Sequence, residues 1–310
     1  MLAEQSRWFI DESLCWTDKP LYWTVNWAKN KLQLEAIAVV DLDGSEEFDN
    51  PRSFDELIDL ISQPVAPLPG KMSKNPKTAA VIMAGGSGER FGRSGGKQLA
   101  EIAGRPVLTW AIESFDAVED VGLIVVVAPE DRHDEYFACA VEPFNFLTPI
   151  VWANSGQLRQ ESAFSGLEQV PDTFEFVAIH DGARPLVDPE LIMHAISTVK
   201  GNLDCDGAVV AHPAIDTLKV VENGVIMGTP DRNVFWNAQT PQVFRAGIYR
   251  RAHASALSDG FVGTDDSSLI ERLGGIVRVV EGKRDNIKLT VPEDFMTLAL
   301  AVRAARARQL

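Results

Sequence analysis

From about residue 78 onward, the sequence alternates between short apolar runs and longer segments whose apolar residues recur at helical spacing. Continuous apolar strands separated by amphipathic helices predict a mostly parallel sheet with helices on both faces. We expect helices over residues 106–115 and 189–199 and from about Pro292. We expect strands over residues 79–84, 122–128, 176–180 and 207–211. The predicted class is α/β, in which ligands bind beyond the carboxyl ends of the strands.

One segment departs from this alternation. Residues 218–227 hold two β-rich stretches on either side of Asn223-Gly224, which is a strong signal for a β-hairpin. Because the hairpin falls between two expected sheet strands, we expect it to project from the sheet as an arm over about residues 212–242.

We divide the chain into an extension (residues 1–63), a linker (64–77) and a main domain (78–310). The linker contains four prolines and no sustained periodicity. The extension has four of the seven tryptophans within its first 27 residues. We expect it to be a small β-rich module, with strands over 21–27 and 32–40 and a helix over 53–61. It either packs as a small core or docks on the main domain, or it binds a regulator or partner.

Composition excludes several classes of protein. With a net charge of −15, the chain lacks the basic field of a general nucleic-acid binder. The apolar runs are far shorter than the roughly 20 residues that cross a bilayer, so we expect no membrane partner. The three cysteines show no CxxC spacing and fit a reducing cytoplasm, and we expect no signal or transit peptide.

A glycine-rich loop follows the first apolar strand and reads AGGSGERFGRSGGKQ over residues 84–98. It matches neither a Walker A loop nor the GxGxxG fingerprint, because Phe91 occupies a glycine position in both and Gln98 follows the lysine. Glycines still let successive backbone N–H groups approach phosphate oxygens, and Arg90 and Lys97 add two cations. The loop therefore favours an anion site, with a solvated surface turn as the alternative.

Further polar clusters follow the expected strands. In HDGARP (residues 180–185), Asp181 is placed where it could hold a divalent metal and Arg184 where it could grip an anion. The other clusters are SGQLRQESAFSGL (155–167), DTLK (216–219), DRNVFWNAQTPQ (231–242), TDD (264–266) and DNIKLT (285–290).

In their order and spacing, these motifs resemble the 2-C-methyl-D-erythritol 4-phosphate cytidylyltransferase family of non-mevalonate isoprenoid biosynthesis. The resemblance covers about residues 78–305 and is silent on residues 1–75. The chain departs from the family at two positions. Gly96 stands where the family usually has proline, and Ser155 stands where it usually has the first of two glycines.

The resemblance implies a Rossmann-like nucleotide-diphospho-sugar transferase fold and the transfer of a cytidylyl group from CTP to methylerythritol phosphate. The products are CDP-methylerythritol and pyrophosphate, the cofactor is Mg²⁺, and the functional unit is a homodimer. The arm is expected to swap between subunits, so that Thr217 and Arg232 serve the partner's site.

The resemblance also assigns roles to individual residues. The implied catalytic residues, of which Lys97 and Lys288 are expected in a solvated cleft, are Arg90, Lys97, Arg232 and Lys288. The implied nucleotide-binding residues are Ala84, Gly85, Gly86, Gly88, Gly156, Ser162 and Asp181. The implied residues around methylerythritol phosphate are Arg184, Thr217, Arg232, Thr264 and Asp265. The implied metal ligands are Asp181 and Asp285.

Two alternatives remain open. A sister family forms CDP-ribitol and shares the glycine loop and the NIK motif, but it usually lacks the lysine that stands here at Lys219. In the other alternative, the chain is an inactive nucleotide-binding regulator whose N-terminal module does the work. Every charged residue expected at the transfer site is present, which argues against that second alternative.

Overall fold

The computed structural model describes residues 36–37, 52–53, 75–86 and 96–307. The chain divides into two units, Met1–Ser62 and Gln63–Leu310. In the first unit, strands β1 (Ala36–Ile37) and β2 (Arg52–Ser53) form an antiparallel pair. Apart from these four residues, the two strands and the helix that were expected in the extension lie outside the described residues.

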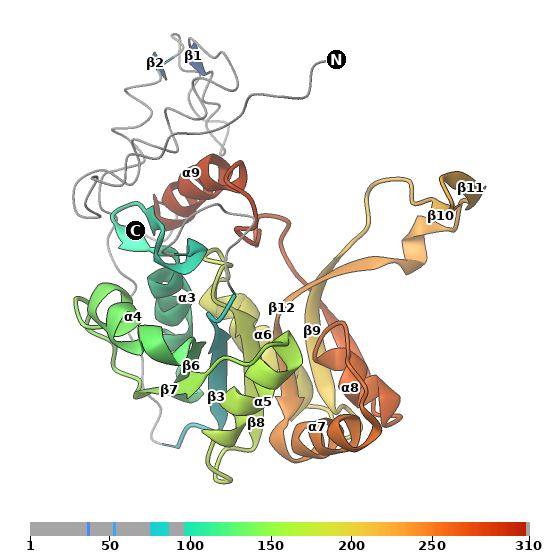
Figure 1. Ribbon diagram of the computed structural model, residues 1–310, viewed down its shortest axis with the longest axis horizontal. Coiled ribbons are helices and arrows are strands. Elements are labelled where there is room, and N and C mark those ends of the chain that lie inside the picture. Colours follow the sequence, from blue (N-terminus) through green and yellow to red (C-terminus); the bar gives the residue numbers. More distant parts are fainter. Residues whose placement is uncertain (1–35, 38–51, 54–74, 87–95, 308–310) are drawn as a thin grey trace. The chain divides into compact units, whose positions relative to one another are not determined.

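The second unit is built on a seven-stranded sheet with the order β13-β9-β12-β8-β3-β6-β7 (Figure 1). The strands are β3 (Thr78–Met83), β6 (Val121–Ala128), β7 (Ile150–Asn154), β8 (Phe176–Asp181), β9 (Gly207–Pro213), β12 (Trp236–Arg245) and β13 (Val277–Glu281). All neighbouring pairs are parallel except those of β12, which runs antiparallel to both β8 and β9. This confirms the prediction of a mostly parallel sheet.

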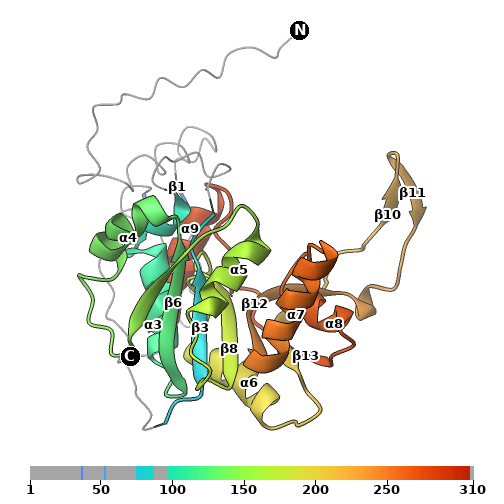
Figure 2. The same ribbon diagram turned by 60° about the horizontal axis from the view of Figure 1, so that its bottom comes forward.

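Helices cover both faces of this sheet, as predicted, and strands β6, β3 and β8 lie side by side among them (Figure 2). One core contains apolar residues of the sheet together with α3 (Val107–Asp116), α4 (His133–Ala140) and α6 (Pro189–Lys200). The other contains α5 (Arg159–Glu168), α7 (Ala246–Asp259) and α8 (Ser267–Arg272). The last helix is α9 (Asp294–Ala307). No helix in the described part of the chain has both the length and the apolar character that a bilayer span requires.

Shorter elements connect these parts. The 3-10 helices among the described residues are η2 (Lys97–Leu99), η3 (Glu130–Arg132) and η4 (Arg232–Val234). A two-stranded ribbon joins β4 (Glu101–Ile102) to β5 (Arg105–Pro106). At the start of α6, the Asp188 carboxylate accepts a hydrogen bond from the Leu191 amide at 2.7 Å, which fixes this helix directly after the turn that follows β8.

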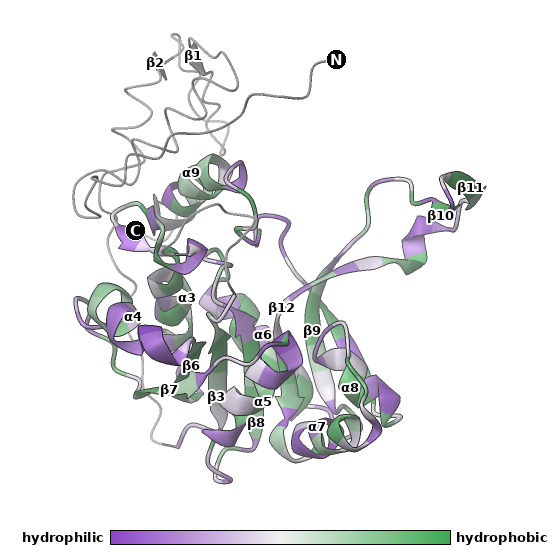
Figure 3. Ribbon diagram, viewed as in Figure 1, coloured by the Kyte–Doolittle hydropathy of each residue, from purple (hydrophilic) through white to green (hydrophobic). Residues whose placement is uncertain are grey.

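The hairpin forms where it was predicted, from β10 (Val220–Glu222) and β11 (Val225–Gly228). The turn residues Asn223 and Gly224 have φ angles of 49° and 80°, the left-handed conformation that a two-residue hairpin turn requires. The hairpin lies at the end of an arm that leads away from the sheet, and its residues are largely hydrophobic (Figure 3). The arm is shorter than predicted, because Gln239–Gln242 are buried within the sheet as part of β12.

Candidate functional site

The glycine-rich segment begins where β3 and β8 end side by side. Met83 pairs with Asp181 across these parallel strands, and the Gly182 amide donates to the Met83 carbonyl at 3.0 Å. The carboxyl ends of neighbouring parallel strands thus bring the start of the loop next to the HDGARP turn, at the edge where α/β folds bind ligands.

The loop start also packs against the SGQLRQES segment. A side chain at Gly85 would overlap Ser155, so glycine is needed for this close approach. The Gly156 amide donates to the Ser162 hydroxyl at 3.0 Å, and that hydroxyl donates to the Leu158 carbonyl at 3.1 Å. The predicted nucleotide-binding residues Gly85, Gly156 and Ser162 therefore meet around the beginning of α5.

The centre of the site is a buried carboxylate with three cations around it. Asp181 lies 2.9 Å from the Lys288 ammonium, 3.3 Å from the Arg184 guanidinium and 3.7 Å from the Arg159 guanidinium. Burial acts to raise the pKa of the Asp181 carboxyl, but these cations outweigh it and hold the pKa well below its usual range. Asp181 is thus ionised and holds three positive groups at the carboxyl end of β8.

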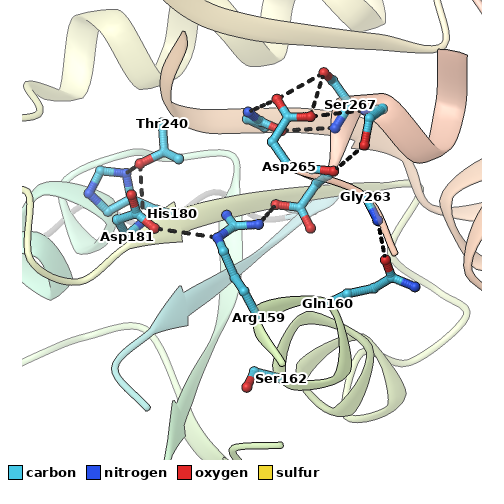
Figure 4. A network of polar contacts seen from close by, with 12 residues as sticks. Arg159, Gln160, Ser162, His180, Asp181, Thr240, Gly263, Asp265 and Ser267 are labelled. Atoms are coloured by element: carbon cyan, nitrogen blue, oxygen red, sulfur yellow. Dashed lines mark hydrogen bonds and ion pairs between the residues drawn. The ribbon is translucent and has the colours of Figure 1, made fainter. Parts of the chain in front are cut away.

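A buried chain of hydrogen bonds fixes the backbone that carries Asp181 (Figure 4). The Asp181 amide donates to the Thr240 hydroxyl, which lies 3.0 Å from Nδ1 of His180. The other ring nitrogen of His180 lies 3.2 Å from the Arg184 carbonyl. Burial lowers the pKa of His180 to about 4, so the ring is neutral at pH 7 and accepts at Nδ1 while Nε2–H donates.

The TDD segment lies on the other side of Arg159. Asp266 accepts from Arg159 and from the Tyr249 hydroxyl, each at 2.6 Å. Asp265 accepts from the Gln242 amide at 2.9 Å and from the Ser268 backbone amide at 3.0 Å. Of the two predicted substrate residues here, Asp265 is held by its own turn and by Gln242 of β12, whereas Thr264 is exposed.

The predicted residues of the arm are not part of this cluster. Arg232 donates to the Ile215 carbonyl at 2.7 Å, and both Arg232 and Thr217 are exposed. Among the described residues, no hydrogen bond or ion pair joins either of them to Asp181 or Lys288. Within one chain, the arm and the cationic cluster are therefore separate.

Lys97 differs from the expectation. Its exposed fraction is 9%, so Lys97 does not lie in a solvated cleft. It is buried because η2 packs between α3 and α4. Gly96, directly before it, has a φ of 73°, which proline cannot adopt. The departure from the family at this position thus matches the backbone geometry of this chain. Gly88 and Arg90 lie outside the described residues, and their predicted roles stay predictions.

The site offers a limited fit to Mg²⁺. Throughout residues 75–86 and 96–307, no group of three or more His, Cys, Asp or Glu side chains is placed to hold a metal. Mg²⁺, however, is commonly held by one or two carboxylates together with substrate phosphates. Asp181 fits that role alone. Asp285 is exposed, and it lies close enough to Lys283 to act on its charge.

Sequence reasoning did not single out Arg159. Its residue type and its motif were visible, but its partners Asp181 and Asp266 lie 22 and 107 positions further along the chain. Only the fold brings them together, so no local pattern would have identified the contact. The one available signal was the position of this arginine, three residues before Ser162, which was expected to bind the nucleotide.

Comparisons with known proteins give one consistent result. The sequence profile of the 2-C-methyl-D-erythritol 4-phosphate cytidylyltransferase family matches residues 78–304. A relative of that name from Caldanaerobacter subterraneus is 42% identical over 226 residues, which cover 73% of this chain and 98% of the relative. Another from Geobacter metallireducens is 43% identical over 220 residues, which cover 70% and 94%.

Solved structures agree with these sequences. The 4-diphosphocytidyl-2C-methyl-D-erythritol synthase from Anaerococcus prevotii superposes with a TM-score of 0.65 at 28% identity and covers 74% of this chain and 100% of its own. A crystal structure of another synthase of that name gives a TM-score of 0.60 at 34% identity, with 73% and 99% covered. The family match begins at Thr78, so residues 1–77 lie outside it.

Proposed function

The chain belongs to the 2-C-methyl-D-erythritol 4-phosphate cytidylyltransferase family, and from that premise we propose how its residues serve the reaction. It is a nucleotidyltransferase of isoprenoid precursor biosynthesis. It transfers a cytidylyl group from CTP to methylerythritol phosphate and forms CDP-methylerythritol and pyrophosphate. The observation that carries the assignment of the site is the cluster of Lys288, Arg184 and Arg159 around Asp181, beside the glycine-rich turn.

The reaction joins two anions, and this defines what the protein must supply. An oxygen of the methylerythritol phosphate forms a bond to the α-phosphorus of CTP, and the bond from that phosphorus to the bridging oxygen of the β-phosphate breaks. Negative charge accumulates on the α-phosphoryl oxygens and on the departing pyrophosphate. Catalysis is mainly positioning and electrostatic stabilisation, and no protein nucleophile is needed.

Lys288 supplies the charge nearest to the reacting phosphoryl group. Its side chain is 37% exposed, so its ammonium can reach a ligand while Asp181 orients it from the buried side. The Arg184 guanidinium donates a hydrogen bond to the Asn286 carbonyl at 2.7 Å, which helps to fix its position. Lys97 and Arg90 act on the triphosphate from the glycine-rich loop.

The nucleotide lies against the turn after β3 and the start of α5. Backbone groups of Ala84, Gly85, Gly86 and Gly88 contact the ribose and phosphates. Gly156 and Ser162 contact the cytosine edge. The support for this placement is the packing of Gly85 against Ser155 and the hydrogen bond from Gly156 to Ser162.

Asp181 is also the residue that would hold Mg²⁺ bound to the triphosphate, whereas the other expected ligand, Asp285, is exposed and its role stays a prediction. When bound there, Mg²⁺ neutralises charge on the phosphate oxygens and helps to align them. A single buried carboxylate at a strand's carboxyl end supports this role.

The functional unit is a homodimer in which each arm reaches the partner's site. Thr217, Arg232, Arg184, Thr264 and Asp265 then surround methylerythritol phosphate. Exposed apolar residues on the hairpin support this proposal, since Val220 is 53% exposed and Ile226 is 60% exposed. Because these side chains are already about half buried, burying the remainder of one contributes about 1 kcal/mol. A two-fold partner offers the surface that would bury them.

The methylerythritol substrate is favoured over ribitol phosphate by the family match itself. The sequence argument from Lys219 carries less weight, because the Lys219 ammonium donates to the Thr229 hydroxyl at 2.7 Å. Lys219 thus joins the two sides of the arm. The grouping of Asp181, Arg184 and Lys288 at one strand end supports an active transferase over the alternative of an inactive regulator.

We place the reaction in the cytoplasm. Cys139 and Cys205 are both free thiols. Thiols without a disulfide partner are usual in a reducing compartment.

The choice of nucleotide tests the proposed base pocket. With methylerythritol phosphate as acceptor, CTP should support pyrophosphate release with a kcat/KM on the order of 10²-fold above that of ATP or GTP, because polar groups fitted to cytosine stay unpaired against a purine. The measurement is the initial rate of pyrophosphate release with each nucleotide. Equal rates with ATP or GTP would remove Gly156 and Ser162 from base recognition.

A further inference from the structure

Two adjacent residues of α5 hold the segment that carries Thr264 (Figure 4). The Gln160 amide nitrogen donates to the Phe261 carbonyl at 3.0 Å, and its amide oxygen accepts from the Gly263 backbone amide at 2.8 Å. Arg159 binds Asp266 at 2.6 Å. The beginning of α5 therefore holds both ends of the segment over residues 261–266.

The segment is tightly built between these two ties. A side chain at Gly263 would overlap the Ser268 hydroxyl, so the turn has no room for a larger residue. Asp265 is held by the Ser268 amide and by Gln242. Thr264 is exposed between the two ties, so its position follows from the position of α5.

The same helix end carries the nucleotide side of the site. Ser162 lies two residues after Gln160 on the same turn of helix, and its hydroxyl accepts from the Gly156 amide. The capping of α5 is done by Glu161, whose carboxylate accepts from the amides of Gln157 and Leu158 at 2.8 and 3.1 Å. Gln160 takes no part in that cap, and both ends of its amide group bind the 261–263 backbone.

We propose that Gln160 is a positioning residue that couples the two substrate sites. By holding the Thr264 segment on the helix end that carries Ser162, it makes each substrate bind more tightly when the other is present. The inference rests on the proposed roles of Ser162 and Thr264. Such coupling is reciprocal, so the factor by which CTP improves binding of methylerythritol phosphate equals the factor in the opposite direction.

Gln160 tests this coupling more cleanly than Arg159. Arg159 also lies beside Asp181, so its replacement would change the charge at the centre of the transfer site. Gln160 is neutral, and within the described part of the chain its side-chain hydrogen bonds go to backbone groups of the 261–263 segment. Its replacement by methionine keeps the length of the side chain and removes both hydrogen bonds.

The experiment compares Gln160→Met and Gln160→Ala with the wild-type chain and with Glu168→Gln. Glu168 is an exposed residue at the other end of α5 and serves as the matched control. Initial rates are measured over a grid of CTP and methylerythritol phosphate concentrations, which yields both KM values and the coupling factor. Thermal midpoints are recorded for each variant.

We expect both Gln160 variants to raise the KM for methylerythritol phosphate about tenfold, as the loss of two hydrogen bonds of ordinary net strength predicts. The KM for CTP at low methylerythritol phosphate should change less than about twofold, and the coupling factor should fall toward one. Glu168→Gln should match the wild type.

Three results would overturn the inference. The first is a coupling factor of 1 in the wild-type chain, and the second is a coupling factor in Gln160→Met equal to that of the wild type. The third is an equal rise of both KM values together with a lower thermal midpoint. A wild-type chain that releases no pyrophosphate from CTP and methylerythritol phosphate would instead count against the proposed function.

Discussion

Replacement of Lys288 by alanine is expected to lower kcat by on the order of 10²-fold or more, as the loss of a group that stabilises transition-state charge predicts. The Lys288 ammonium lies 2.9 Å from Asp181. Asp181 keeps Arg184 and Arg159 as partners in the variant, so its charge stays compensated and the fold should persist. The measurement is single-turnover CDP-methylerythritol formation, with circular dichroism and the thermal midpoint as checks of folding.

Lys283 provides a matched control on the same loop. Its ammonium pairs with Asp188 at 2.7 Å, and its side chain is 65% exposed. Lys283→Ala should therefore leave kcat within about twofold, the scale expected for an exposed ion pair away from the chemistry. If folded Lys288→Ala keeps near-wild-type kcat, Lys288 has no part in the transfer. Lys97→Ala is a weaker test, because Lys97 is buried and its loss also removes packing.

Arg232→Ala is expected to raise the KM for methylerythritol phosphate on the order of 10²-fold, and much more than the KM for CTP. A guanidinium can bind a phosphate with two parallel hydrogen bonds, and its removal leaves the substrate anion without that partner. In one chain, Arg232 donates only to the Ile215 carbonyl at the base of the arm, among the contacts of the described residues. Its proposed role therefore depends on the partner subunit.

The proposed sharing of each site between two subunits gives a second prediction, which concerns mixed dimers. At a methylerythritol phosphate concentration far below the raised KM of Arg232→Ala, the Arg232→Ala and Lys288→Ala homodimers should each be nearly inactive. In a randomly mixed population, half of the dimers are hybrids and each hybrid has one site with both residues intact, so about one quarter of wild-type activity should return. Subunit exchange is verified by native mass spectrometry. Verified exchange without any return of activity would mean that Arg232 acts within its own chain.

Local patterns predicted the elements whose stability comes from a continuous apolar face. Strand β3 and helix α6 have the predicted ranges to within one or two residues, because their apolar spacing reflects direct packing in the two cores. The hairpin turn was predicted for a similar reason, since Asn223-Gly224 favours the left-handed backbone on its own.

Strand β12 was read as a polar motif and not as a strand. Its central residues Gln239 and Gln242 are buried but polar, so they give no apolar run. Gln239 donates to the Lys283 carbonyl at 3.0 Å, and Gln242 bonds both Asp265 and the Ser267 amide. Those partners lie far along the chain, and only the assembled sheet satisfies such side chains.

Part of the site was predictable from local motifs. Asp181, Arg184 and Lys288 were expected from their motifs, and the fold brings them together at one strand end. The parts played by Arg159, Gln160 and Thr240 depend on pairings over long stretches of sequence, so no motif reveals them. The burial of Lys97 follows from the packing of η2, which the loop sequence does not encode.

The central claim is that this chain makes CDP-methylerythritol, and identification of the reaction product tests it most directly. The purified chain is incubated with CTP and Mg²⁺, together with either methylerythritol phosphate or ribitol phosphate, and the products are identified by mass spectrometry and ³¹P NMR. We predict CDP-methylerythritol with one equivalent of pyrophosphate, and a kcat/KM for ribitol phosphate lower by on the order of 10²-fold. CDP-ribitol as the preferred product, or no product from either polyol phosphate, would contradict the claim.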